Sequence, residues 1–345
     1  MNWMLKTLSL AIIFPLLAFA ADETVIKTPE EIQAELDKAE ADFKRAQEMF
    51  NPWYAGPLIT GGAHNMPPGS ALFAPFVSFS DNYAVWNGKR KLISVPDRYV
   101  LNPQLATFIF GITDFLDFTV VGQGIARWQQ NKSSGGFGDL TLGIGIPILK
   151  EGLNRPAIRL VFNETFPTGR YQNLKPGLLA LDISGSGSYQ TQIGFRMSKL
   201  TFWSHKHPMN FRCAYSYTIP TDVHVHGFNA YGGGYDAAGT VTPGQSQQAN
   251  AAFEYSFTQN WVFACDFVYN WTAKTTFRGN PGHLKDGTPS VVGDGYSDQL
   301  SLAPAIEYNP SANLNFVGGV WFDVYGRNTG KFVSGIVVAN YTFKI

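Results

Sequence analysis

The sequence predicts an all-β fold, an antiparallel transmembrane β-barrel of about 12 strands with a short N-terminal α-helix. Three observations lead to this prediction. Only 15% of the residues are charged, where about 25% is usual, while aromatic residues reach 14%. From about residue 72 onward, apolar and polar side chains alternate, as they do on the two faces of a β-strand. The connections between these segments are mostly short and long in turn, which is typical of membrane barrels.

The first 20 residues have the features of an export signal. One positive charge precedes an apolar run from Leu8 to Ala20, and the last three residues of this run, Ala-Phe-Ala, fit the rule for signal cleavage. A membrane-anchoring helix would need about 20 apolar residues, and this run is shorter. We therefore predict a signal peptide over residues 1–20 that is cleaved before Ala21. No other stretch approaches the length of a spanning helix, which excludes a helical membrane protein.

Charge and cysteine content exclude two further classes of protein. The chain has 26 basic and 26 acidic residues, so it has no long-range field that would attract nucleic acid. Its two cysteines, Cys213 and Cys265, are too few for the disulfide framework of a small exported domain. They fall on predicted strands that are not neighbours, beyond the reach of a disulfide bridge. We interpret both as small apolar residues that face lipid.

Residues 21–50 predict a periplasmic helix. The sequence Thr-Pro-Glu-Glu at 28–31 provides an N-cap, a proline at the first helical position and acids in the first turn. From Ile32 to Phe50, apolar residues follow one another at alternating spacings of four and three, and Asn51-Pro52 ends the pattern. A single amphipathic helix on a protein surface fits this stripe. A short coiled coil that joins barrels into a homo-oligomer through residues 29–50 fits it as well.

Residues 71–345 carry the barrel pattern. The clearest segment is 138–149, where leucine and isoleucine occupy alternate positions and glycine, threonine and aspartate occupy the others. A soluble β-sandwich would bury its apolar face and carry many charges on the other, whereas here the aromatic residues lie on the apolar face and near strand ends, as in the interfacial girdles of membrane barrels. Strands are predicted near residues 71–80, 100–112, 115–127, 137–148, 156–166, 188–198, 210–219, 248–258, 261–272, 298–308, 313–325 and 331–344. The long connections are predicted at residues 81–99, 167–187, 220–247 and 273–297.

Two parts of the barrel resemble known proteins. The last strand resembles the C-terminal signal by which outer-membrane barrels are recognised for assembly, with Tyr341 and Phe343 at alternate positions and Ile345 where an aromatic residue is usual. The motifs GFGDLTLGIGIP from Gly136, FPTG from Phe166 and GSGS at 185–188 resemble the family named for the MetA pathway of phenol degradation. That family is described as outer-membrane transporters, distantly similar to the fatty-acid transport porins. The resemblance covers about residues 100–345 and implies an outer-membrane transporter without identifying its solute.

Residues 51–70 are rich in proline and glycine and show no period, so they are predicted to connect the helix to the barrel without forming an element of their own. Trp53, Tyr54, Leu58 and Ile59 make this connector apolar enough to fold into the lumen as a hatch. The N-terminal segment of the fatty-acid porins folds in this way. A plain periplasmic linker is the alternative interpretation.

Few ionisable residues face the interior of the predicted barrel, and they are candidates for function because charges away from water cost free energy unless they are solvated or paired. The predicted pore-lining residues are Asp117, Asp139, Arg159, Arg196, Arg212, Glu254, Asp266, Glu307 and Asp323. The three arginines come from three consecutive strands, and three of the acids lie at similar depth on the remaining wall. This predicts basic and acidic arcs that face each other across the lumen. Such a constriction would filter solutes by charge, and a purely structural network of ion pairs is the alternative.

The sequence contains no recognisable catalytic or metal-binding set. Two histidine pairs, His205 with His207 and His224 with His226, lack a third ligand, so neither a metal nor another cofactor is expected. The His-x-Ser triplet of outer-membrane phospholipases is missing, and Asp222 beside His224 only faintly resembles the dyad of outer-membrane proteases. We predict no enzyme.

The function predicted from these features is passage of small, hydrophobic or aromatic solutes across the outer membrane of a Gram-negative-type bacterium. The partners expected for such a barrel are outer-membrane lipids, the barrel-assembly machinery and small-molecule solutes. The alternative is a barrel without transport that acts in surface adhesion or envelope organisation through its long loops.

Overall fold

The computed structural model describes residues 28–49, 53–104, 106–202 and 207–345. The predicted signal peptide, the predicted helix stop at Asn51-Pro52 and the histidine at position 205 lie outside the described residues. The chain divides into two compact units, Met1–Lys44 and Arg45–Ile345.

Helix α1 spans Pro29–Met49, and it begins at the predicted cap. The Thr28 hydroxyl accepts a hydrogen bond from the backbone amide of Glu31 (3.3 Å), and the Glu31 carboxylate accepts one from the backbone amide of Thr28 (2.8 Å). This capping box satisfies two amides that the first helical turn would otherwise leave without partners. Ile32 and Leu36, on the apolar stripe, are both exposed. Within the described part of the chain, no helix has the length and apolarity to cross a membrane.

The second unit consists almost entirely of β-strands, with one short 3₁₀ helix, η1 (Pro176–Leu178). The strands are β1 (Ser70–Phe73), β2 (Phe76–Trp86), β3 (Leu92–Gln104), β4 (Ala106–Thr113), β5 (Leu116–Gly122), β6 (Gly124–Gln129), β7 (Lys132–Phe137), β8 (Leu140–Leu149), β9 (Ala157–Phe166), β10 (Gln190–Thr201), β11 (Met209–Pro220), β12 (Val223–His226), β13 (Ala238–Thr242), β14 (Ser246–Ser256), β15 (Trp261–Thr272), β16 (Thr276–Asn280), β17 (Ser297–Tyr308), β18 (Leu314–Arg327) and β19 (Thr329–Lys344).

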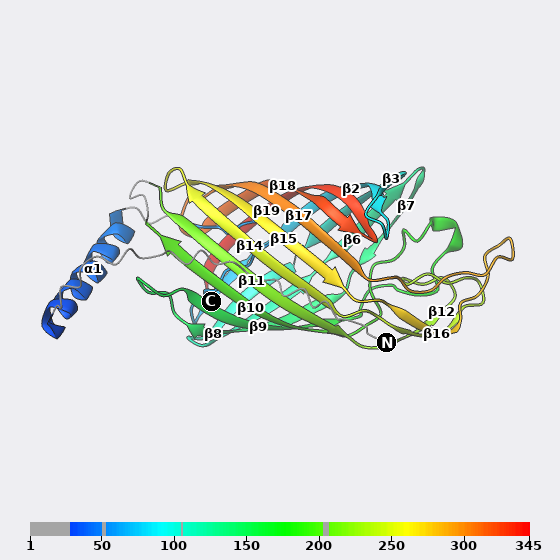
Figure 1. The fold of residues 1–345 in the computed structure, drawn as a ribbon, viewed down its shortest axis with the longest axis horizontal. Helices are drawn as coiled ribbons and strands as arrows, with labels where there is room; N and C mark the ends of the chain where they lie inside the picture. Colours follow the sequence, from blue (N-terminus) through cyan, green and yellow to red (C-terminus); the bar gives the residue numbers. More distant parts are fainter. Residues whose placement is uncertain (1–27, 50–52, 105, 203–206) are drawn as a thin grey trace, which may run out of the picture. The chain divides into compact units, whose positions relative to one another are not determined.

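The main sheet closes into an antiparallel barrel of 12 strands, as predicted. Each of the first four barrel strands is divided into two consecutive segments, which are β1 and β2, β3 and β4, β5 and β6, and β7 and β8. The last strand, β19, pairs with β18 on one side and with β1 and β2 on the other. Pairing of the last strand with the first leaves no open edge between them, which is the arrangement that satisfies backbone polar groups in lipid. Figure 1 shows the strands strongly tilted, as closure of a barrel requires.

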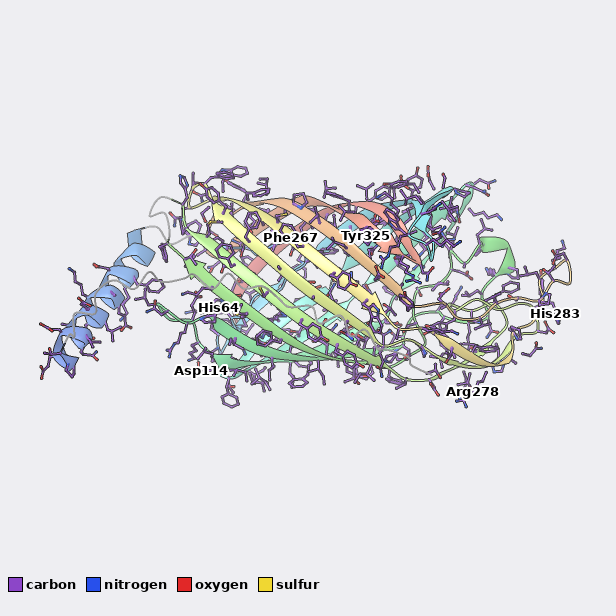
Figure 2. All side chains as sticks on the ribbon, in the orientation of Figure 1. His64, Asp114, Phe267, Arg278, His283 and Tyr325 are labelled. Atoms are coloured by element: carbon purple, nitrogen blue, oxygen red, sulfur yellow. The ribbon has the colours of Figure 1, made fainter. Side chains whose placement is uncertain are left out.

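The alternation of residue types places apolar side chains outside and ionisable ones inside. On the outer face, Phe267 is 45% exposed and Val337 is 61% exposed. Figure 2 shows Phe267 and Tyr325 on the barrel wall. On the inner face, Glu254 of β14 and Glu307 of β17 are fully buried. This is the inverse of a water-soluble β-protein, and it fits a barrel whose outer surface contacts hydrocarbon.

The two ends of the barrel differ, and we refer to them as the turn end and the loop end. At the turn end lie the connections at 114–115, 150–156, 257–260 and 309–313, together with the described residues between β10 and β11. At the loop end, residues 167–189, 221–245 and 273–296 form three long connections, and the last two contribute β12, β13 and β16 to a separate three-stranded antiparallel sheet. Figure 1 shows these loops extending beyond the barrel strands.

The structure corrects two predicted connections. Residues 81–99 are not a long loop, because β2 and β3 extend through most of this range and join in a turn over 87–91. Asn87-Gly88 is a strong hairpin signal that identifies this turn. Residues 128–136, which lie between two predicted strands, are also mostly strand, because β6 and β7 are joined by Gln130-Asn131 alone. Gln130 takes a left-handed conformation (φ 55°) that is uncommon for a residue other than glycine. That turn therefore has no glycine to mark it in the sequence.

Candidate functional site: a chain segment inside the barrel

Residues 53–66, here called the lumen segment, run along the inside of the barrel wall and are held there by carboxylates. The backbone amide of Ala55 donates to Glu307 (2.8 Å). The amides of Ile59 and Thr60 donate to the two oxygens of Asp266, at 3.2 and 2.8 Å. Further along, the amide of Met66 donates to Asp117 (3.1 Å), and that of Ala63 donates to the Ser198 hydroxyl (3.0 Å). Buried acids from β5, β15 and β17 thus serve as acceptors for a segment without secondary structure.

Side-chain amides and hydroxyls hold the remaining polar groups of the lumen segment. Asn309 donates to the backbone carbonyl of Trp53, and Asn340 donates to that of Ala55 (3.3 Å). The Tyr54 hydroxyl donates to the carbonyl of Pro208 (3.1 Å) and accepts from the hydroxyl of Ser256 (2.9 Å). Asn65 donates to the carbonyl of Gly145 (3.0 Å). Of these partners, Asn309 and Pro208 fall in connections between predicted strands, and the others fall within predicted strands.

One face of the lumen segment packs on an apolar part of the inner wall. Leu58 is buried in a cluster with small and branched residues of β15, β17, β18 and β19. The buried members of this cluster are Leu58, Ala264, Ala303, Ala305, Val317 and Ile336, and Ala55, Ile59, Phe76, Trp321 and Val338 pack against them. Alanines at the inner positions of β15 and β17 leave room for the Leu58 side chain. Of the four predicted hatch residues, Leu58 and Ile59 therefore anchor apolar contacts, while Trp53 and Tyr54 form polar contacts at the turn end.

The inward charges are paired at contact distance, and this corrects the prediction of opposed arcs. Asp117 and Arg159 form a buried ion pair. Arg212 donates to both oxygens of Glu254 from the neighbouring strand β14, at 2.6 and 2.9 Å. Opposite charges in a low-dielectric interior stabilise each other far more at contact than across a lumen. Arg196 differs, because its guanidinium forms no hydrogen bond or ion pair with any residue that the structure describes.

Two consecutive glycines allow the lumen segment to approach the arginines. A Cβ added to Gly61 would lie 2.6 Å from a terminal nitrogen of Arg196, and one added to Gly62 would lie 2.9 Å from Arg212. Both distances are shorter than real Cβ contacts, so any other residue at these positions would require the arginine side chains to move. In the sequence these glycines were evident only as part of a Gly- and Pro-rich connector. Their contacts explain part of that composition.

The other two predicted pore-lining residues lie away from the lumen segment. Asp139 accepts hydrogen bonds from the backbone amides of Gly169 and Ser186, and so fixes the connection that follows β9. Asp323 accepts from the Trp86 indole and from the backbone amide of Phe332 near the loop end. The structure therefore brings six of the nine predicted ionisable residues into contact with the lumen segment, and a seventh, Glu254, is bonded to one of these six, Arg212. It places the other two elsewhere.

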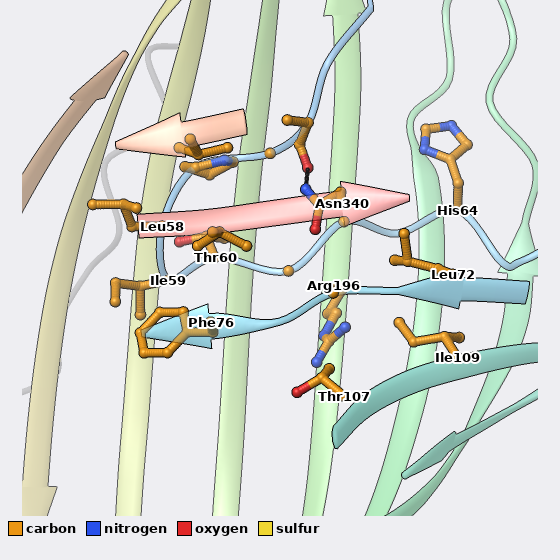
Figure 3. Close-up of a pocket in the computed structure, with 18 of the residues that line it drawn as sticks. Leu58, Ile59, Thr60, His64, Leu72, Phe76, Thr107, Ile109, Arg196 and Asn340 are labelled. Carbon is orange, nitrogen blue, oxygen red and sulfur yellow. Dashed lines mark hydrogen bonds between the residues drawn. The ribbon is translucent and has the colours of Figure 1, made fainter. Parts of the chain in front are cut away.

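A cavity of about 460 Å³ lies between the lumen segment and the inner wall. Arg196 lines it, with Leu72, Phe76, Thr107 and Ile109 from β1, β2 and β4 (Figure 3). Its size is within the range typical of sites for small organic molecules, about 300–1,000 Å³. No pattern in the sequence indicates this cavity, because it is formed where an irregular segment meets strands near it in sequence, β1, β2 and β4, and the distant Arg196 of β10.

The residues of the resembled assembly signal lie on the strand that closes the barrel. Tyr341 pairs with Phe73 and Phe343 with Ala71 in the ladder between β19 and β1. The rings of Tyr341 and Phe343 stack at 5.7 Å between centroids. The backbone amide of Ile345 donates to Gly69 (2.9 Å). Their role in assembly stays a prediction.

No group of three or more His, Cys, Asp or Glu side chains in the described ranges is arranged to hold a metal ion. His283 and Asp236 form an exposed pair at 3.3 Å in the long loops. The hydrogen bond from the backbone amide of His283 lowers the pKa of Asp236 and outweighs the small effect of burial.

Comparisons with known proteins agree with this architecture. No protein-family model matches the sequence, and a search of curated proteins found no match. An outer membrane channel from Pseudomonas putida F1 has a similar structure, with 13% sequence identity and a TM-score of 0.61 over 82% of this chain and 98% of that chain. The translocator domain of the autotransporter NalP from Neisseria meningitidis is 9% identical, with a TM-score of 0.42 over 90% of this chain and 98% of that one. A mutant of TodX, a monoaromatic hydrocarbon channel, is 10% identical, with a TM-score of 0.36 over 81% and 91% of the two chains.

The likeness to the Pseudomonas channel concerns the fold alone, and it identifies that fold as the outer-membrane type of β-barrel. The resemblance to the MetA-pathway family stays a prediction, because no family model matches the sequence.

Proposed function

We propose that this protein is a channel for small solutes in the outer membrane of a Gram-negative-type bacterium, and that the lumen segment is its hatch. The apolar outer face of the barrel suits lipid, and the ionisable inner face suits a solute path. A barrel of eight strands is filled by its own side chains, whereas one of about 16 holds an aqueous channel. A barrel of 12 strands lies between these two, so its lumen has room for an added segment. Residues 53–66 are such a segment.

The observation that carries this proposal is the way in which the lumen segment is bound. The described backbone groups of residues 53–66 that bond to the wall bond to wall side chains, and none of them bonds to the backbone of the wall. Two side chains of the segment, Tyr54 and Asn65, donate to backbone carbonyls of the wall. The strands already use their own backbone groups in the barrel ladder, so release of the segment would leave the barrel closed. A segment with removable tethers inside a permanent barrel is what a hatch requires.

A reversible disulfide tests the hatch directly. Ala63 and Ser198 are both buried, and the amide of the first donates to the hydroxyl of the second at 3.0 Å. We expect Ala63→Cys with Ser198→Cys to form a bridge in a background where Cys213 and Cys265, both free, are changed to serine. In planar bilayers the oxidised variant should show lower open probability than the same molecule after reduction.

Two controls make the result decisive. Each single cysteine variant, treated with the same oxidant and reductant, should show no change in conductance. A conductance that is equal before and after reduction of the double variant would contradict the hatch. Liposomes loaded with small sugars, amino acids and aromatic acids test transport itself, because a sealed barrel would admit none of them.

The alternative, a surface protein without transport, finds its support in the long loops. The sheet of β12, β13 and β16 has its own buried apolar contacts, formed by Val223, Val225 and Val241. Such a rigid surface is suited to binding a partner. If liposomes containing the protein stay impermeable to every solute, this alternative becomes the better proposal.

The finer predictions about partners belong to this proposal as well. We propose hydrophobic or aromatic solutes, recognition of β19 by the barrel-assembly machinery, and association through the exposed stripe of α1. Replacing Leu36 with aspartate, which tests the last of these, should convert an oligomer to a monomer in detergent without changing the conductance per barrel.

A further inference from the structure

The cavity beside the lumen segment combines an apolar side with an unpaired cation. Leu72 and Ile109, on β1 and β4, line one side of it, and Phe76 of β2 extends this surface (Figure 3). Arg196 reaches it from β10, and the paired side chains of Asp117, Arg159 and Arg212 line it as well. Apolar walls with a small number of placed polar groups are the usual composition of a small-molecule site.

Arg196 is the one arginine of the inward cluster whose charge has no acid at contact among the described residues. Its cross-strand neighbour Arg159 is bound to Asp117, and Arg212 is bound to Glu254. Two further acids of the inward cluster, Asp266 and Glu307, accept hydrogen bonds from the lumen segment. The local acids are therefore already engaged, and the guanidinium of Arg196 keeps its donors for another acceptor.

The lumen segment holds Arg196 in place without using those donors. Gly61 lies against the guanidinium so closely that a Cβ would be 2.6 Å from one terminal nitrogen and 2.7 Å from the central carbon. This packing limits the side chain on one side and leaves the cavity on the other. Leaving a positive charge unpaired inside a barrel costs free energy, which a bound anion would recover.

We infer that this cavity binds a small organic monocarboxylate with an apolar body. The carboxylate accepts two parallel hydrogen bonds from Arg196, a geometry that suits guanidinium and carboxylate. The apolar body lies against Leu72, Phe76 and Ile109. One unpaired arginine beside the Asp117 carboxylate matches a single negative charge better than the double charge of phosphate. This inference rests on the proposed function, and it names the class of solute that the channel would take.

Binding of benzoate to the full-length mature protein in a neutral detergent tests the inference by isothermal titration. Benzoate should bind measurably, and benzyl alcohol, which has the same ring and no charge, should bind more weakly. Arg196→Met should weaken benzoate binding by about tenfold or more, as expected for loss of a charge-assisted hydrogen-bonded pair. Arg196→Lys keeps the charge but loses the paired geometry, so its affinity for benzoate should lie between that of wild type and that of Arg196→Met.

The matched control is Arg278→Met, which removes an arginine of β16 in the exposed loops (Figure 2) and should leave binding unchanged. Equal affinity of wild type and Arg196→Met for benzoate would overturn the inference, as would equal affinity for benzoate and benzyl alcohol. Thermal unfolding of each variant serves to show that it is folded. Because Arg196 has no bonded partner in the described chain, its replacement should not lower the melting temperature.

Flux measurements separate this inference from the channel proposal. If liposomes admit neutral and acidic solutes alike and Arg196→Met changes neither, the channel stands and the carboxylate site fails. If benzoate binds through Arg196 while liposomes stay sealed to every solute, the site stands and the channel fails.

Discussion

The two ends of this barrel hold irregular chain in different ways. At the turn end, the lumen segment bonds to the wall through side chains such as Asp266, Glu307 and Ser198. At the loop end, the long connections are held largely by backbone hydrogen bonds, including a complete ladder over β12, β13 and β16. Asp139 is an exception there, since its carboxylate binds two loop amides.

The difference follows from what each segment finds beside it. Inside the barrel, the wall strands that bond to the lumen segment pair with a neighbour on each side, so their backbone amides are already used in the ladder. Beyond the ends of the strands, loops are free to pair with one another. A segment held by side chains is tied by a few separate contacts, each of which a substitution removes, whereas a backbone ladder opens only as a unit. We therefore expect the turn end to be the part that moves.

Deletion of residues 53–66 should have the largest effect. It removes the lumen segment and leaves the barrel ladder complete, so single-channel conductance in planar bilayers should rise at least severalfold. Val241→Asp is the matched change at the loop end. This fully buried valine packs inside the small sheet, and a charge there should make the loops sensitive to protease. Its conductance should stay close to that of wild type. Equal conductance of the deletion variant and the wild type would contradict the expectation that the lumen segment at the turn end blocks the channel.

A smaller effect is expected from Asp266→Asn. The carboxylate accepts from two consecutive backbone amides, and an asparagine has only one oxygen with which to replace it. Loss of one charge-assisted hydrogen bond, about 1.5–3 kcal/mol, should raise the population of released segments by about tenfold or more. Labelling of Thr60→Cys by a water-soluble thiol reagent, with the native cysteines replaced, measures this population.

The control for this experiment is Asp139→Asn, which changes a buried acid of the same type on the loop side. It should alter the dynamics of the connection after β9 and leave the labelling rate at position 60 unchanged. If both variants accelerate labelling equally, the effect is a general loss of barrel stability and the distinction between the two ends fails.

Much of the barrel could be predicted because alternation is a local property of each strand. Segment 138–149, with isoleucines at 144 and 148 outside and glycines at 143 and 145 inside, shows this directly. The strand count followed from such segments, and the inward residues followed from their register. Connections were harder. Asn87-Gly88 marks a hairpin turn that the prediction placed within a loop, and Gln130 turns the chain without any signal.

The arrangement of the candidate site was only partly predictable. Inward orientation of Arg159, Arg196 and Arg212 follows from period two. Which of them has an acidic partner depends on side-chain contacts in three dimensions. Asp117 reaches Arg159 past the intervening strand β8, which has Gly145 at that level. The contacts between Gly61 and Arg196 join residues far apart in sequence, and no pattern within either segment records them.

The smallest expected effect is a pH dependence at the turn end, where Glu151 receives the lumen segment through His64 (3.1 Å). Burial raises the pKa of Glu151. Hydrogen bonds from His64 and from the backbone amide of Leu200, together with the charge of Lys199, lower this pKa by more, so that it lies below its ordinary value. A lowered pKa means that this carboxylate stabilises the folded state fully above its ordinary pKa, about 4.3, and that the stabilisation is lost as the pH falls through the lower folded value.

Glu151→Gln should therefore melt a few degrees below wild type at pH 6, and the gap in melting temperature should close as the pH drops below about 4. Asp114→Asn, at an exposed turn of the same barrel end, should show no such gap at either pH (Figure 2). A gap for Glu151→Gln that persists unchanged at pH 3 would mean that the charge of Glu151 is not what ties His64 to the wall, and that packing holds this part of the lumen segment instead.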